Sequence, residues 1–82
     1  MHVADWRGAF TEAFQHLQVT IQRGEATPID AYAAKSPAEF FAVISEYFFE
    51  LPAVVQAAYP AVYTQLKAFY RQDPLQRTSV KR

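Results

Sequence analysis

The sequence predicts an all-α fold, a small bundle of three main helices with one additional short helical turn. Apolar residues recur at intervals of three and four over long stretches, which is the period of an amphipathic helix. No stretch shows the clean alternation of apolar and polar residues that is typical of a half-buried strand. The five prolines fall at the edges of the periodic stretches, where helices begin and end.

The first helix is expected to begin near Asp5, a residue that can cap a helix N-terminus, and to end at Gly24, which tolerates a left-handed conformation. Its apolar residues follow one another at spacings of four, four, three and four, which places them on one face. They are Trp6, Phe10, Phe14, Leu17 and Ile21. The pattern predicts a helix of about four to five turns with one buried stripe.

Residues 24–35 show no sustained period and are predicted to form a connection with one short turn. Connections of this length in a small domain tend to be functional or disordered. Because Ile29 and Tyr32 lie within this connection, we expect a packed loop.

The second helix begins with a complete set of N-terminal signals. Ser36 is a preferred N-cap, Pro37 suits the first helical position, and Glu39 stands where its carboxylate can complete a capping box. The apolar residues that follow cover most of the helix circumference, which predicts a central helix surrounded by others. They are Phe40, Phe41, Val43, Ile44, Tyr47, Phe48, Phe49 and Leu51.

Pro52 is expected to end the second helix, because the residue before a proline disfavours the helical conformation. A short turn over residues 53–58 follows, and Pro60 opens a third helix that stops before Pro74. One face of this third helix is apolar and consists of Val62, Leu66, Phe69 and Tyr70, with Tyr63 beside it.

Length and composition indicate one small domain over residues 1–74, followed by a disordered basic tail over residues 75–82. Seven Phe, five Tyr and one Trp favour a real core over disorder. Eight basic residues balance eight acidic ones, so the net charge gives no reason to expect a nucleic-acid partner.

Several classes of protein and site are disfavoured by what the sequence lacks. It contains no cysteine, so neither a disulfide framework nor a thiolate metal site is available. No apolar run approaches the roughly 20 residues that span a bilayer, and the first residues do not resemble a signal peptide. We therefore expect no membrane association and a cytoplasmic location.

Three glutamates in the second helix are candidate functional residues. Glu39, Glu46 and Glu50 lie within about 40° of one another around the helix axis. This edge could simply face solvent, or it could form a cation-binding or catalytic edge, since carboxylates in an apolar setting need a positive partner. Glu39 alone is also explained by the capping box, and His16 is expected on the solvated face of the first helix.

Two stretches carry a family resemblance: IDAYAAKSPAEFFAVISEYFFE at residues 29–50 and FYRQDPLQR at residues 69–77. Together they resemble the C-terminal part of the Mlc titration factor A family of bacterial zinc-dependent peptidases, and the resemblance extends from about Trp6 to Arg77. It implies that the bundle is half of a gluzincin-type metallopeptidase domain. In such domains the zinc is held by the two histidines of an HExxH helix and by a glutamate from a later helix.

Transferred to this sequence, the resemblance implies that Glu39 is the third zinc ligand. Tyr32, seven residues earlier, would donate a hydrogen bond to the developing oxyanion of the peptide substrate. Glu46 is a possible acceptor that orients a ligating histidine, or it could form a salt bridge to a neighbouring helix.

The sequence departs from the family pattern because it contains no HExxH motif. We expect a fragment of a zinc peptidase that is inactive without the missing N-terminal half of the domain and that self-associates when isolated. An alternative is a non-catalytic helical interaction module that binds a partner such as a transcriptional repressor. A third possibility is a surface carboxylate cluster that binds divalent cations weakly.

Overall fold

The computed structural model describes the backbone of residues 3–75 and the side chains from Trp6 onward. The helices in chain order are α1 (Val3–Gln22), the 3-10 helix η1 (Ala31–Ala34), α2 (Pro37–Glu50), α3 (Pro52–Ala58) and α4 (Pro60–Tyr70). The described residues contain no strand. The predicted all-α fold is confirmed, and the expected short turn at residues 53–58 is the seven-residue helix α3.

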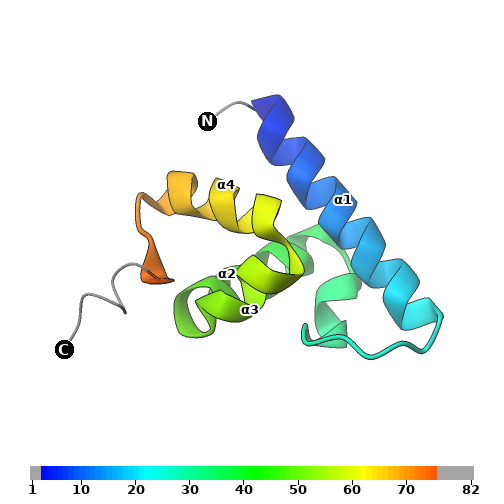
Figure 1. Cartoon of the computed structure of the whole chain (residues 1–82). Helices are drawn as coiled ribbons and strands as arrows, with labels where there is room; N and C mark the ends of the chain where they lie inside the picture. The colour runs from blue at the N-terminus through cyan, green and yellow to red at the C-terminus, as the bar shows by residue number, and fades with distance from the viewer. Residues whose placement is uncertain (1–2, 76–82) are drawn as a thin grey trace.

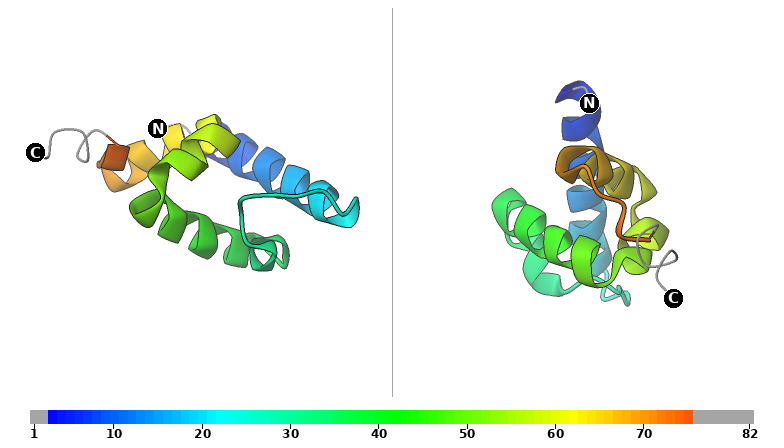
Figure 2. Two further views of the ribbon diagram at one scale, coloured as in Figure 1. Left: turned by 60° about the horizontal axis from the view of Figure 1, so that its bottom comes forward. Right: turned by 90° about the vertical axis from the view of Figure 1, so that its left-hand side faces the viewer.

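The helices form two sides of a small bundle. In the left view of Figure 2, α2 lies on one side, and α1 and α4 lie on the other. The loop containing η1 connects the two sides at one end, and α3 connects them at the other (Figures 1 and 2). Helix α2 contacts η1, α3, α1 and α4, so the core lies along its inner face.

Helix α1 begins earlier than the sequence predicted and ends where it predicted. It starts at Val3, so the expectation that Asp5 caps the helix is wrong. At the other end, Gly24 takes a left-handed φ of 72°. The Gly24 amide donates to the Ile21 carbonyl and the Glu25 amide to the Thr20 carbonyl, both at 3.0 Å. These two bonds close the helix in a Schellman motif.

The buried stripe of α1 differs from the predicted one. Of its predicted members only Leu17 is fully buried, and the small neighbours Ala13 and Thr20 are buried beside it. The large rings at the start of α1 are half-buried and pack against one another across helices. The indole of Trp6 lies 5.8 Å from the ring of Phe41 and 5.1 Å from that of Phe69.

Helix α2 buries one stripe, so the expectation that other helices surround it is wrong for this chain. Phe40, Ile44 and Phe48 are buried at four-residue intervals. Phe41, Val43 and Tyr47 are only half-buried, while Phe49 and Leu51 are 38 % and 53 % exposed. The sequence shows apolar residues around more of the α2 circumference than its neighbours η1, α1, α3 and α4 cover.

The C-terminal part of the described chain is held by Tyr63. This residue is buried rather than beside the apolar face of α4. Its hydroxyl donates to the Asp73 carboxylate at 2.5 Å and accepts from the Leu75 amide at 3.3 Å. Leu75, the first residue of the predicted tail, is half-buried, and residues 76–82 lie outside the described part of the chain.

None of the helices between residues 3 and 75 combines the length and the apolar character needed to cross a lipid bilayer.

Replacing Phe48 with alanine should destabilise the chain far more than the same change at its neighbour Phe49. Phe48 is 0 % exposed and Phe49 is 38 % exposed. A buried Phe→Ala change costs roughly 3–5 kcal/mol, whereas a partly exposed ring loses only a fraction of that. Urea unfolding followed by circular dichroism measures both losses, and equal losses would contradict the burial pattern of α2.

Candidate functional site

The three residues selected from the sequence as site residues lie around one surface depression of about 340 Å³. All of its lining residues come from α2 or from η1 and the residue that precedes it. They are Asp30, Tyr32, Glu39, Ala42, Val43, Glu46 and Tyr47. The structure therefore brings Tyr32, Glu39 and Glu46 together.

The N-terminus of α2 positions Glu39. Ser36 is extended (φ −161°, ψ 161°), and its hydroxyl accepts a hydrogen bond from the Glu39 amide at 3.2 Å. This confirms the Ser36 half of the predicted capping box. The carboxylate of Glu39 interacts instead with the phenol of Tyr32 and raises its pKa. The cap therefore uses the backbone of Glu39 and leaves its carboxylate at the depression.

The short helix η1 positions Tyr32. Asp30 caps η1, because its Oδ1 accepts from the Tyr32 amide at 2.9 Å. A 3-10 helix turns by about 120° per residue, so adjacent side chains point in very different directions. Ala33 is accordingly buried at 0 % exposure, while Tyr32 is 48 % exposed. The expected packed loop is correct for Ile29, which is 1 % exposed, and wrong for Tyr32.

The phenol of Tyr32 has a raised pKa. Its cause is first a hydrogen bond with the Glu39 carboxylate, then the negative charge of that carboxylate, and last a small contribution from burial. Both main effects favour the protonated phenol, since ionising it would place a second negative charge beside the first. Tyr32 therefore keeps its O–H group over the whole neutral range.

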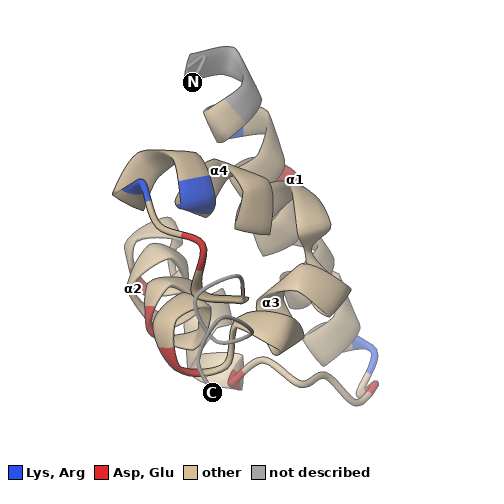
Figure 3. Ribbon diagram, turned by 60° about the vertical axis from the view of Figure 1, so that its left-hand side comes forward, with Lys and Arg blue, Asp and Glu red and all other residues tan. Residues whose placement is uncertain are grey.

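The glutamate edge of α2 is divided in the structure. Figure 3 shows acidic residues at several positions along α2. Glu46 lies at the depression and is exposed, whereas Glu50 is exposed outside it. Asp30, which precedes η1, lines the depression as well. The edge thus contributes two of its three glutamates to the candidate site.

Sequence reasoning missed two lining residues, Asp30 and Tyr47. Asp30 could have been found, because Asp just before a short helical turn is a preferred N-cap. Tyr47 was counted among the core residues of α2, and its ring is indeed half-buried. Its hydroxyl accepts from the Asp30 amide at 3.2 Å, a contact between residues 17 positions apart that no local pattern indicates.

The donor set of the depression is incomplete for a metal. Between residues 3 and 75, no three His, Cys, Asp or Glu side chains are grouped closely enough to hold a metal ion. A catalytic zinc requires three protein ligands in addition to a water molecule. The described residues alone therefore do not form such a site.

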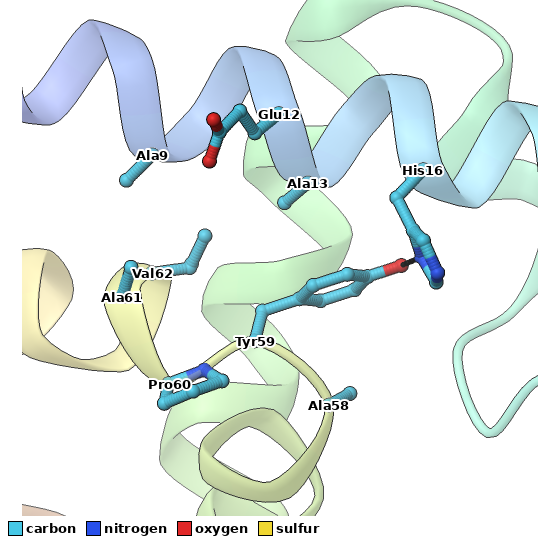
Figure 4. A pocket seen from close by; sticks show the side chains of 9 residues that line it. All are labelled: Ala9, Glu12, Ala13, His16, Ala58, Tyr59, Pro60, Ala61 and Val62. Carbon is cyan, nitrogen blue, oxygen red and sulfur yellow. Dashed lines mark hydrogen bonds between the residues drawn. The ribbon is translucent and has the colours of Figure 1, made fainter.

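His16 lies at a different depression, of about 380 Å³, between α1 and the start of α4 (Figure 4). Its side chain is exposed, as expected, and its Nδ1 lies 3.0 Å from the hydroxyl of Tyr59. Glu12 lines the same depression. Neither His16 nor Glu12 is among the residues around Tyr32 and Glu39.

Comparison with known proteins connects this arrangement to a family. The family model described as glucose-regulated metallo-peptidase M90 matches residues 1–71. Over 77 residues the chain is 47 % identical to proteins named Mlc titration factor A from Edwardsiella ictaluri and from Yersinia pestis and Yersinia pseudotuberculosis. These matches cover 92 % of this chain but 30 % of the Edwardsiella protein and 28 % of the Yersinia proteins. The chain therefore spans less than a third of the length of the relatives it matches.

Changing Glu39 to glutamine should lower the pKa of Tyr32 towards its ordinary value of 10.0. The amide removes the negative charge that opposes ionisation of the phenol. Because the folded-state pKa is raised, this interaction stabilises the fold below about pH 10 and is lost as the pH rises through the folded-state pKa. Carbon-13 NMR of the tyrosine ζ carbons in the metal-free chain measures the shift, with Tyr32→Phe to assign the signal.

Glu50→Gln is the matched control for this titration, because Glu50 is on the same helix and outside the depression. A Tyr32 pKa that moves equally in both variants would contradict a specific contact with Glu39.

Proposed function

The chain belongs to the glucose-regulated metallo-peptidase M90 family, and on that premise we propose that it forms part of a zinc-dependent peptidase. In this proposal Glu39 is one of the metal ligands, and Tyr32 donates a hydrogen bond to the peptide substrate. The observation that carries the proposal is the placement of an exposed phenol and a carboxylate side by side at one depression, from two separate helices.

The chemistry of the two side chains supports these roles. Zinc, when bound, would polarise the substrate carbonyl and activate a water molecule for hydrolysis of the peptide bond. The Glu39 carboxylate is a suitable oxygen ligand for zinc, and its backbone is fixed by the Ser36 cap. The raised pKa of Tyr32 keeps its hydroxyl protonated, as a donor to a developing oxyanion must be.

The remaining ligands would come from outside these 82 residues, since no HExxH motif occurs in them. The incomplete burial of α2 at the depression supports this part of the proposal. Val43 and Tyr47, which line the depression, are only half-buried. Further chain packed over the depression would cover these side chains and would bring the missing histidines to Glu39. Alone, the 82 residues would be inactive, and Glu46 would orient one of those histidines.

The proposal includes a setting for the complete enzyme. We place it in the cytoplasm, acting on peptides, with no nucleic-acid or membrane partner. The isolated chain would self-associate through apolar side chains that the missing half would otherwise cover.

A second candidate function is a non-catalytic interaction module. The relatives are named Mlc titration factor A, and the partner of such a module would be a transcriptional repressor, as the family resemblance implies. An aromatic patch formed by Trp6, Phe10, Phe41 and Phe69 favours this second function. Phe69, whose ring contacts those of Trp6 and Phe41, is 48 % exposed. Aromatic residues of this kind are enriched in protein interfaces.

Glu39→Gln in the complete protein should abolish both zinc retention and peptidase activity. The side-chain amide of glutamine is a poor zinc ligand. The backbone N–H of residue 39, which donates to the Ser36 hydroxyl, is unchanged, so the fold should persist. Zinc per chain by native mass spectrometry and the rate of peptide hydrolysis are the two measurements.

Glu50→Gln serves as the control, because it removes one carboxylate from the same helix outside the depression. Full zinc occupancy and activity in Glu39→Gln would rule out Glu39 as a ligand, whereas absence of zinc and activity from the unsubstituted complete protein would leave the interaction module as the better function.

A further inference from the structure

We propose that Asp30 and Tyr47 are positioning residues that hold the hydroxyl of Tyr32 beside Glu39. This inference rests on the proposed function, in which Tyr32 contacts the substrate. Neither Asp30 nor Tyr47 would itself touch the reacting atoms. They would act through the backbone of η1.

The side chain of Asp30 fixes the start of η1. Its Oδ1 accepts from the amide of Tyr32 at 2.9 Å, and its carbonyl accepts from the amide of Ala33 at 3.0 Å. Its backbone is extended at φ −55° and ψ 134°, so it joins the preceding loop to the first turn of η1. The conformation from which the Tyr32 side chain leaves the backbone is therefore set by Asp30.

Tyr47 anchors Asp30 to the helix that carries Glu39. The hydroxyl of Tyr47 accepts from the amide of Asp30 at 3.2 Å. Its half-buried ring belongs to α2, eight residues after Glu39. The backbone of α2 joins Glu39 to Tyr47. One hydrogen bond joins Tyr47 to Asp30, and a second joins Asp30 to Tyr32, so Glu39 is connected to Tyr32 through Tyr47 and Asp30.

The Tyr32 ring needs this support because, apart from the contact of its hydroxyl with the Glu39 carboxylate, little else holds it. It is 48 % exposed, and the Lys35 ammonium that lies over it is 5.7 Å from the ring centroid. A buried core residue would be fixed by its neighbours, whereas an exposed ring takes its direction from its backbone. An oxyanion donor that is displaced by about 1 Å loses much of its effect on the transition state.

Both flanks of η1 are held independently of the Asp30 side chain. The side-chain amide of Gln18 donates to the Ala34 carbonyl at 3.2 Å, and Ile29 is buried at 1 % exposure just before Asp30. Loss of the Asp30 side chain should therefore leave the loop in place and release only the direction of Tyr32.

A double-mutant cycle in the complete zinc-loaded protein tests the proposal. Tyr32→Phe alone should lower kcat about a hundredfold. Asp30→Ala alone should lower kcat roughly tenfold or more, with little change in KM, and it should cause no further loss in the Tyr32→Phe background. Tyr47→Phe, which removes one hydroxyl, should show the same dependence on Tyr32 with a smaller loss.

Asp30→Asn is the conservative control, because asparagine also caps helices and can accept from the Tyr32 amide. It should retain most of the activity. Zinc per chain and the thermal midpoint should remain those of the unsubstituted protein in all of these variants, which separates positioning from a loss of metal or fold.

The outcomes are distinct. If Asp30→Ala causes an equal loss with and without the Tyr32 hydroxyl, or if it removes zinc, Asp30 does not act through Tyr32 and the inference is wrong. If Tyr32→Phe itself leaves kcat unchanged, the proposed function of Tyr32 fails first, and the positioning role fails with it.

Discussion

The rotation of α2 about its own axis determines the rest of the structure. Phe40, Ile44 and Phe48 must all face the core, and each is at most 1 % exposed. Burying a phenylalanine is worth roughly 1.5–3 kcal/mol, so no other rotation of this helix competes. With Phe40 inside, Glu39 is carried to the rim. The cap from Ser36 and the proline at position 37 then fix where the first turn begins.

The same rotation gives α2 two different faces. Its inner face is complete within this chain, while the half-buried Val43 and Tyr47 lie at its edge beside the candidate site. Tyr32 reaches the same site from η1, in which the adjacent residue Ala33 is buried against the core. The packing that stabilises the fold therefore also places the candidate site, because both depend on how α2 is rotated about its axis.

Local signals predicted much of this structure, and long-range contacts account for what they missed. The left-handed Gly24, the Ser36 cap and the prolines that begin α2 and α4 act over one helical turn, and all were predicted from the sequence. Pro52 was predicted to end the second helix, and it also begins α3, where only a short turn was expected. Apolar periodicity showed that α2 could be covered on most sides, but it does not show how many neighbours are present. Asp5 was a plausible cap, yet α1 begins two residues earlier, at Val3. Continued helix formation outweighs the cap preference at this end.

The candidate site shows the same division. The ligand role of Glu39 and the choice of Tyr32 came from a family resemblance, although helical spacing had already marked Glu39 together with Glu46 and Glu50. The structure places Tyr32 and Glu39 at one depression. The contact of Asp30 with Tyr47 depends on how the loop folds back onto α2, so sequence spacing could not reveal it. Periodicity also could not distinguish Glu46 from Glu50, because the limit of the depression is set by η1, an element outside the helix.

The most direct measurement is a crystal structure of the complete protein with zinc, with the metal located by its anomalous scattering. We predict a Glu39 carboxylate oxygen at about 2.0–2.2 Å from the zinc and the Tyr32 hydroxyl facing the open coordination position. A zinc ion bound elsewhere, with the Glu39 carboxylate in solvent, would contradict the assignment of this depression as part of a metal centre.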